Sequence, residues 1–135
     1  MTYEEKKAWL WRYRDAQKLL KQLCYRLEEA RTAARHTTQN FSPTPSGSGD
    51  GQSLARAVER TDDLEHQVTF QLAECDALYE EIDEVLQQLE DFREYHIMKG
   101  YYLDIKTWEQ VAHDMNYSLS MIYVVRRKAM EQLRL

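Results

Sequence analysis

The sequence is short of the residues that interrupt helices or crosslink small folds. It contains two prolines, four glycines and two cysteines among 135 residues. Both prolines and three of the glycines lie between residues 40 and 53, so little breaks helices elsewhere. The cysteines, Cys24 and Cys75, are too few and too far apart for a disulfide framework or a zinc site. Both fall on apolar helical stripes, which predicts small, buried hydrophobic side chains.

Long apolar runs are also missing. No segment approaches the roughly 18 apolar residues of a membrane span, and no charged-then-apolar leader opens the chain. We therefore expect no membrane span, no signal peptide and a cytoplasmic location. Residues of high β-propensity never alternate over the length of a strand, which predicts an all-α fold.

The polar residues show no catalytic pattern. The histidines lack the HExxH-type spacing of a metal site: they are His36, His66, His96 and His113. Acidic pairs such as Glu80-Glu81 resemble a di-metal set only in isolation, because no ExxH arrangement accompanies them. A glycine-rich phosphate loop and a nucleophile elbow are also missing. We expect a protein that is not an enzyme and has no catalytic residue, metal or cofactor.

The first 38 residues predict one long helix. Thr2 and Glu5 have the spacing of a capping box, in which each side chain accepts a backbone N–H group at a helix start. Apolar residues then alternate in steps of four and three, the heptad seam of a coiled coil. The seam residues are Trp9, Tyr13, Ala16, Leu20, Leu23, Leu27, Ala30 and Ala34. A helix with so wide an apolar stripe needs a partner.

The partner is a second heptad helix from Leu54 to about Glu90. A polar, Gly/Ser-rich loop at about 39–53, which we expect to be flexible, precedes it. Residues 1–38 hold nine basic and five acidic side chains, whereas residues 53–98 hold three basic and thirteen acidic ones. Opposite charge favours a long antiparallel coiled-coil-like hairpin over residues 1–90, held mainly by apolar burial. The seam residues are Leu64, Val68, Leu72, Cys75, Leu78, Tyr79, Ile82, Val85, Leu86 and Leu89.

The acidic helix itself has two interpretations. Its carboxylates could mimic nucleic acid or bind a basic partner, although a solubilising face is the commoner role of such residues. Under either interpretation, so negative a helix should point away from DNA phosphates.

The C-terminal residues predict a helical unit over residues 91–135. Asp91 can cap a helix from Phe92 to Leu103, although the sequence leaves open whether that helix continues the acidic one or bends from it near Glu90. Gly100 lowers the stability of this helix by about 1 kcal/mol relative to Ala. Close approach of another helix is one of several explanations for a glycine there.

Two short helices follow. Thr107 and Gln110 form a capping box, so a helix begins at Trp108 and ends near Asn116, which tolerates left-handed backbone. Ser118 can cap a last helix, about Leu119 to Arg134. Apolar residues form one face of each helix: Trp108, Val111, Ala112 and Met115 in the first, and Ile122, Val125, Ala129 and Leu133 in the second.

This pattern favours a helix-turn-helix that reads duplex DNA, although a helical hairpin of purely structural role has similar periodicity. Small Ala112 would allow two helices to cross closely over the turn. The last helix would enter the major groove. We expect base contacts from Ser120, Tyr123, Val124 and Arg127, and phosphate contacts from Thr107, Ser118, Arg126 and Lys128.

The same residues carry a resemblance to a known family. The run YYLDIKTWEQVAHDMNYSLSMIYVVRRKAMEQL resembles the C-terminal part of a phage and prophage family, which is related to phage late-gene transcriptional regulators. Its helix-turn-helix is similar to region four of bacterial sigma-70 factors. The landmarks are Tyr102-Leu103, Lys106-Thr107-Trp108-Glu109, Val111-Ala112, Asp114-Met115, Tyr117-Ser118 and Ala129. The likeness covers roughly the last 45 residues well and the front half loosely.

The resemblance implies transcriptional control of phage genes inside a bacterial host cell, with RNA polymerase as a further partner. Relatives often carry more polar and basic residues where this chain has Met121, Tyr123 and Val124. Residues 99–135 hold six basic and four acidic side chains, so we expect weak DNA binding by a monomer. A homodimer through the hairpin, or tethering to polymerase, could supply the missing affinity.

Two other functional classes stay open. One is a phage packaging protein of small-terminase type, which also joins a helix-turn-helix to helical oligomerisation elements. The other is a polymerase-binding adaptor without DNA affinity, whose apolar last helix grips the enzyme.

Overall fold

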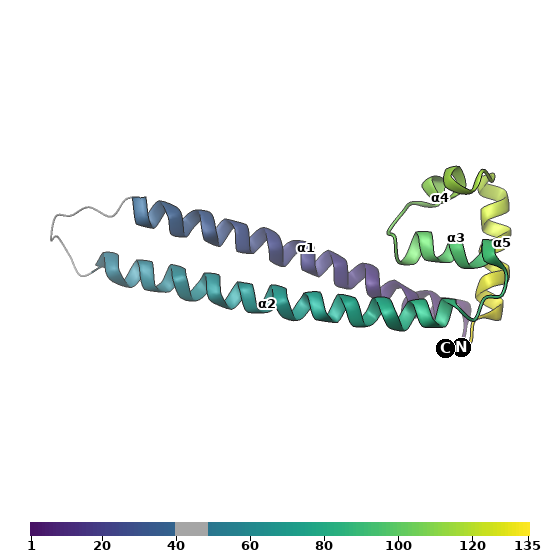
Figure 1. Cartoon of the computed structure of the whole chain (residues 1–135), viewed down its shortest axis with the longest axis horizontal. Helices are drawn as coiled ribbons and strands as arrows, with labels where there is room; N and C mark the ends of the chain where they lie inside the picture. The colour runs from purple at the N-terminus through teal and green to yellow at the C-terminus, as the bar shows by residue number, and fades with distance from the viewer. Residues whose placement is uncertain (40–48) are drawn as a thin grey trace. The chain divides into compact units, whose positions relative to one another are not determined.

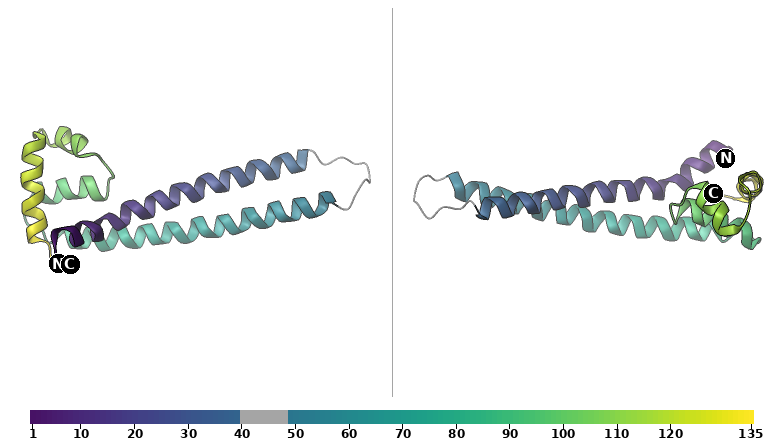
Figure 2. Two further views of the ribbon diagram at one scale, coloured as in Figure 1. Left: turned by 180° about the vertical axis from the view of Figure 1, so that it is seen from behind. Right: turned by 90° about the horizontal axis from the view of Figure 1, so that it is seen from above.

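The computed structural model describes residues 1–39 and 49–135, which form five helices and confirm the all-α fold. The helices are α1 (Tyr3–Gln39), α2 (Gly49–Leu86), α3 (Phe92–Tyr102), α4 (Trp108–Met115) and α5 (Leu119–Gln132). Helices α1 and α2 run antiparallel to each other, as Figures 1 and 2 show from different sides. Among the described residues, no helix combines the length and the apolar character needed to cross a membrane.

The start of α1 agrees with its predicted capping box. The Thr2 Oγ1 atom accepts the backbone N–H of Glu5 at 3.2 Å, and the Glu5 carboxylate accepts the backbone N–H of Thr2 at 3.4 Å. This reciprocal pair satisfies two of the N–H groups that a helix start leaves without intrahelical partners. Helix α1 accordingly begins at Tyr3.

Helix α2 begins earlier than predicted. Residues 40–48 of the predicted loop lie outside the described residues, but residues 49–53 are helical, so a loop reaching Ser53 is wrong. The first N–H groups of a helix lack intrahelical partners in any case, so the first turn tolerates polar residues and glycine better than the interior does.

Helix α2 ends at Leu86, and a new helix starts at Phe92. The two helices are therefore separate and the helix is interrupted near Glu90, a question that the sequence had left open. The predicted cap is confirmed, because the Asp91 Oδ1 atom accepts the backbone N–H of Arg93 at 2.9 Å. Hydrogen bonds from the side chain and backbone of Arg93 hold the pKa of Asp91 below its usual value.

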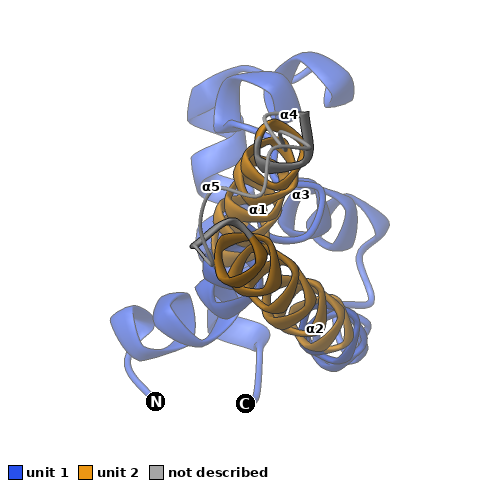
Figure 3. Cartoon of the chain, turned by 90° about the vertical axis from the view of Figure 1, so that its left-hand side faces the viewer, with its two compact units in different colours: residues 1–17, 74–135 blue, residues 18–73 orange. Residues whose placement is uncertain are grey.

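The chain forms two compact units, coloured separately in Figure 3. Unit 1 comprises residues 1–17 and 74–135, and unit 2 comprises residues 18–73. The predicted domains, 1–90 and 91–135, have a boundary that differs from those of the two units, and they stay a prediction. In unit 1 the first turns of α1 and the end of α2 pack with the three short helices.

The larger core lies in unit 1. Its buried side chains come from α1, from α2 and the segment after it, and from α3 and α5 with their flanking residues: Leu10, Ile82, Leu86, Leu89, Met98, Tyr102, Leu103, Ala129, Met130 and Leu133. Leu10 is fully buried, although it lies one residue away from the predicted seam. Burial of a leucine side chain contributes about 2 kcal/mol, so the N-terminal turns help to hold this unit together.

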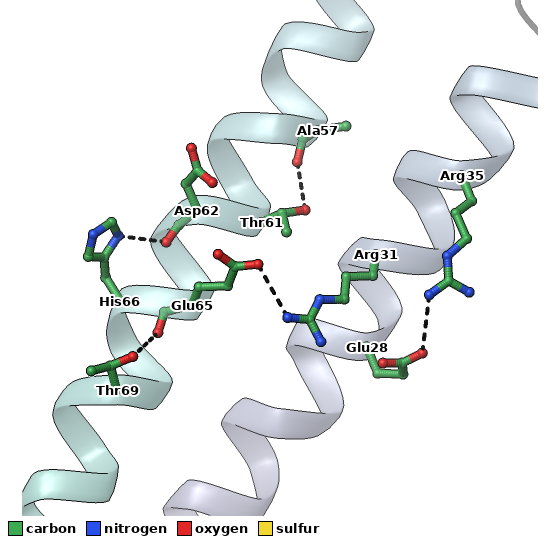
Figure 4. Close-up of polar contacts among 9 residues, drawn as sticks. All are labelled: Glu28, Arg31, Arg35, Ala57, Thr61, Asp62, Glu65, His66 and Thr69. Atoms are coloured by element: carbon green, nitrogen blue, oxygen red, sulfur yellow. Dashed lines mark hydrogen bonds and ion pairs between the residues drawn. The ribbon is translucent and has the colours of Figure 1, made fainter.

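Unit 2 has a narrower core of Leu27, Ala30 and Leu64, with Val68 packed against it. Figure 4 shows the polar contacts nearby, where Arg31 Nη2 lies 3.2 Å from Glu65 Oε1 across the two helices. Both side chains are largely exposed, so this ion pair contributes little to stability. Apolar burial therefore holds α1 against α2, as expected from the sequence.

The predicted seams are correct in α1 and wrong at one place in α2. All eight predicted positions of α1 are buried or half-buried. In α2, however, Leu72 is 48% exposed and Gln71 is buried in its place. Gln71 lies seven residues after Leu64 and seven before Leu78, so the buried stripe keeps heptad spacing, whereas the apolar pattern of the sequence favoured the neighbouring Leu72.

The two cysteines differ in their surroundings. Cys75 is buried, as predicted, but Cys24 is exposed, so the prediction for Cys24 is wrong. Position 24 directly follows Leu23, which occupies the buried stripe of α1. Neighbouring residues on a helix point about 100° apart, and the burial of one therefore leaves the other at the edge.

Candidate nucleic-acid interface

The start of α4 is fixed by the predicted capping box. The Thr107 Oγ1 atom accepts the backbone N–H of Gln110 at 3.1 Å, and the Gln110 Oε1 atom accepts the backbone N–H of Thr107 at 2.9 Å. Thr107 has extended backbone angles, φ −77° and ψ 162°, as a capping residue requires. Helix α4 therefore begins at Trp108.

A tight turn separates α4 from α5. Asn116 adopts left-handed backbone angles, φ 59° and ψ 40°, and ends α4. The backbone N–H of Tyr117 donates to the carbonyl of Ala112 at 2.9 Å and closes the turn. The Ser118 Oγ atom then accepts the backbone N–H of Met121 at 3.2 Å and starts α5. The predicted turn and both predicted caps are thus confirmed.

A small core holds the three short helices together. Ile97 of α3, Val111 and Ala112 of α4, and Ile122 and Val125 of α5 are all buried in it. A Cβ atom built on Gly100 would lie only 3.2 Å from Val111 Cγ2. Gly100 therefore allows α3 to approach α4 closely, which was one of the explanations that the sequence had left open.

The outer flank of α5 is exposed. Met121, Tyr123 and Val124 are 39%, 41% and 50% exposed. The remaining predicted contact residues on α5, Ser120, Arg127 and Lys128, are also exposed, whereas Arg126 is half-buried. The flank thus combines aromatic and aliphatic surface with two exposed cationic side chains.

The predicted phosphate contacts Thr107 and Ser118 lie at the starts of α4 and α5. Each hydroxyl oxygen accepts a backbone N–H group. Because a hydroxyl can donate and accept at once, each side chain still has an O–H proton for an acceptor such as a phosphate oxygen. Thr107 and Ser118 are both exposed residues.

Arg126 is the predicted site residue with the most distinctive surroundings. Its guanidinium carbon lies 5.1 Å from the centre of the Trp108 ring and 5.1 Å from that of Tyr123. Its Nε atom is buried and has no hydrogen-bond partner in the described part of the chain. Sequence reasoning grouped Arg126 with Lys128 as phosphate contacts, but the structure packs Arg126 against aromatic rings.

Ion pairing limits which other cations are available. Lys106 Nζ lies 2.7 Å from Asp114 Oδ2. This contact raises the pKa of Lys106 and lowers the pKa of Asp114, since their hydrogen bond favours both charged forms. The charge of Lys106 is thus locally offset by that of Asp114, while Arg127 and Lys128 are exposed cations on the flank of α5 itself.

Two side chains of α1 also donate hydrogen bonds to the ends of the short helices, and sequence reasoning did not identify them. Lys6 Nζ donates to the Met130 carbonyl at 2.8 Å, near the end of α5. Arg14 Nη1 donates to the Tyr101 carbonyl at 2.9 Å, at the end of α3. Cations favour the carbonyl ends of helices, but nothing in the local sequence tells which helix a distant lysine or arginine will reach.

The residues described by the structure hold no group of three or more His, Cys, Asp or Glu side chains suited to a metal ion. Comparison of the chain with protein-family models, curated proteins and solved structures finds no match.

Proposed function

We propose that this protein binds duplex DNA through α5 and acts as a phage-type transcriptional regulator with a sigma-70 region-four-like helix-turn-helix. The observation that supports this most is the exposed flank of α5, set by a tight left-handed turn after a short helix. An α-helix with a free outer flank fits the width of the major groove.

Each flank residue has a role in this proposal. Arg127 would donate to a guanine edge, while Tyr123 and Val124 would contact thymine methyl groups or base edges. Lys128, with the hydroxyls of Thr107 and Ser118, would hold phosphates and set the register of α5. Residues 99–135 carry only six cationic side chains against four acidic ones, so binding should depend on few phosphate contacts.

The decisive variant is the double substitution Arg127→Ala/Lys128→Ala. Both side chains are exposed, so their removal leaves the core intact. We expect the affinity for a labelled duplex at low salt to fall at least about tenfold, and the slope of log affinity against log salt to fall by about 0.9, since Lys128 makes one phosphate contact and each such contact contributes about 0.9. Fluorescence anisotropy over a salt series measures both.

The matched control is Lys18→Ala/Lys21→Ala, which removes two exposed cations from α1. It changes net charge equally but should leave affinity within about twofold, because neither lysine belongs to the proposed interface on α4 and α5. Equal losses in both double variants would show general electrostatic attraction, and unchanged binding by Arg127→Ala/Lys128→Ala would contradict the proposed interface.

A second candidate, a polymerase-binding adaptor, is favoured by the apolar part of the same flank. Met121, Tyr123 and Val124 are exposed apolar side chains within four residues of α5, and exposed apolar patches often mark protein-binding surfaces. Co-purification of bacterial RNA polymerase with the wild-type chain, its loss with Val124→Glu, and no affinity for duplex DNA would select this function.

A further inference from the structure

Cationic and aromatic side chains form a continuous ladder through unit 1. The Arg14 guanidinium lies 4.5 Å from the Trp11 ring centre and 4.6 Å from that of Tyr101. Tyr101 stacks on Trp108 with ring centres 3.7 Å apart and planes 11° from parallel. Arg126 then lies over Trp108 and over Tyr123, at 5.1 Å from each ring centre. The ladder thus runs from α1 through α3 and α4 to α5.

The ladder ends on the proposed DNA-contacting flank. Tyr123 and Arg126 are three residues apart on α5, a spacing at which helical side chains meet. Tyr123 is 41% exposed, so without a neighbour its ring would be free to change rotamer. A cation about 5 Å from a ring centre attracts the ring face, and this attraction favours one orientation.

The burial of the Arg126 Nε atom restricts how its guanidinium could bind a phosphate. Arginine usually binds phosphate in a bidentate manner, through two parallel N–H groups of its planar guanidinium. Because the Nε atom of Arg126 is buried, the edge of the guanidinium that includes the Nε–H group cannot contact a phosphate. Exposed Arg127, its neighbour in sequence, has no such restriction.

We propose that Arg126 is a positioning residue that fixes the Tyr123 ring for base contact, and not a phosphate ligand. This inference rests on the proposed DNA-binding function. Trp108, which stacks on Tyr101, also lies 5.1 Å from the Arg126 guanidinium carbon and restricts its position. A ring ordered before binding loses less rotamer entropy when it meets DNA, which increases affinity without a new contact.

Conservative substitutions separate the two roles. Lysine keeps the charge but cannot stack as a planar guanidinium. We expect Arg126→Lys to weaken duplex binding about fivefold to tenfold, as loss of one cation–π contact would. The matched control is Arg26→Lys, at an exposed arginine of α1 outside the proposed interface, and it should leave duplex binding within about twofold. Wild-type affinity in Arg126→Lys would overturn the proposal.

A double-mutant cycle identifies Tyr123 as the residue through which Arg126 acts. In a Tyr123→Ala background, Arg126→Lys should change affinity less than about twofold, since coupled residues are not additive. An equal loss in both backgrounds would show that Arg126 contacts DNA independently and would overturn the proposal. Thermal unfolding of each variant, followed by circular dichroism, reports whether affinity changes follow from lost folding.

A measurement without DNA tests the ladder separately from the proposed function. In the free protein, the Hε proton of Arg126 should resonate upfield of the Arg127 Hε proton because it lies against two ring faces, and Trp108→Leu should reduce this shift. An unshifted Hε overturns the proposal even if duplex binding is intact. A shifted Hε in a chain that binds no duplex supports the fixed ring and contradicts the DNA-binding function instead.

Discussion

Gly100 shows how one residue decides the spacing of two helices. An added Cβ atom would lie 3.2 Å from Val111 Cγ2, and Val111 is itself buried in the small core. Alanine would gain about 1 kcal/mol of helix propensity but would press against a β-branched side chain with little freedom to move. The gain and the steric penalty therefore oppose each other at this position.

We expect the penalty to win. Gly100→Ala should lower the free energy of unfolding by about 1 kcal/mol, as overpacked cores do. Urea titration followed by circular dichroism measures this change. Gly51→Ala is the matched control, because nothing lies within 4 Å of its added Cβ atom and it also lies within a helix. It should stabilise α2 by a few tenths of a kcal/mol, and equal effects of both substitutions would contradict close packing at Gly100.

At the scale of elements, the turn between α4 and α5 depends on the backbone of Asn116. Its φ of 59° lies in the left-handed region, which is unfavourable for residues with a Cβ atom and least so for asparagine and aspartate. The two N-caps, Thr107 and Ser118, set where each helix starts, and Asn116 sets the direction in which the chain leaves α4.

Asn116→Ala should destabilise the protein by about 1 kcal/mol, because alanine lacks the local hydrogen bonding that lets asparagine adopt this conformation. Asn116→Gly should remain within about 0.5 kcal/mol of wild type, since glycine adopts positive φ without steric cost. Chemical unfolding of the three proteins measures the differences. Equal stability of the alanine and glycine variants would contradict a left-handed turn at this position.

At the scale of the whole molecule, the surface of unit 2 bears on association between copies. Val58 and Leu72 are 49% and 48% exposed. They are separated by two heptads on α2, so they share one flank. Residues 18–39 of α1 hold five basic and two acidic side chains, and residues 49–73 of α2 hold two basic and five acidic ones. An antiparallel second copy would place basic α1 against acidic α2 over this apolar flank.

We expect a homodimer through this flank, with a monomer favoured by Val58→Glu/Leu72→Glu because two buried carboxylates would lack partners. Light scattering at micromolar concentration measures the mass. Phe70→Glu is the control, since Phe70 is exposed but points about 200° away from Leu72 on the helix. A monomeric wild type would contradict the dimer, and a ring-sized mass would favour the small-terminase alternative.

Local patterns in the sequence were reliable wherever short-range chemistry decides the structure. The capping residues Thr2, Asp91, Thr107 and Ser118 bond within their own helix turns, so their spacing alone predicts the helix starts. The seam of α1 and the exposed flank of α5 follow from helical periodicity in the same way. DNA binding itself stays a prediction.

The errors in predicted burial occurred where either of two adjacent residues could have occupied the buried face of a helix. Leu72 and Cys24 lie beside the buried residues Gln71 and Leu23, and the apolar pattern alone did not tell which of two neighbours faces the partner helix. Likewise, only Asp91 indicated in the sequence that a new helix starts at Phe92. An aspartate at that position can be a helix cap or an ordinary surface residue, so it did not settle whether the helix is interrupted.

The sequence by itself determined the all-α fold, most helix bounds and the exposed side of α5, because these depend on contacts between residues three or four positions apart. Only the tertiary structure decided that Lys6 and Arg14 of α1 reach carbonyls at the ends of α5 and α3, and that the Arg126 guanidinium lies close to two aromatic rings. Such contacts join residues far apart in the chain. They depend on how whole helices pack, and the spacing of residues within one helix does not predict that packing.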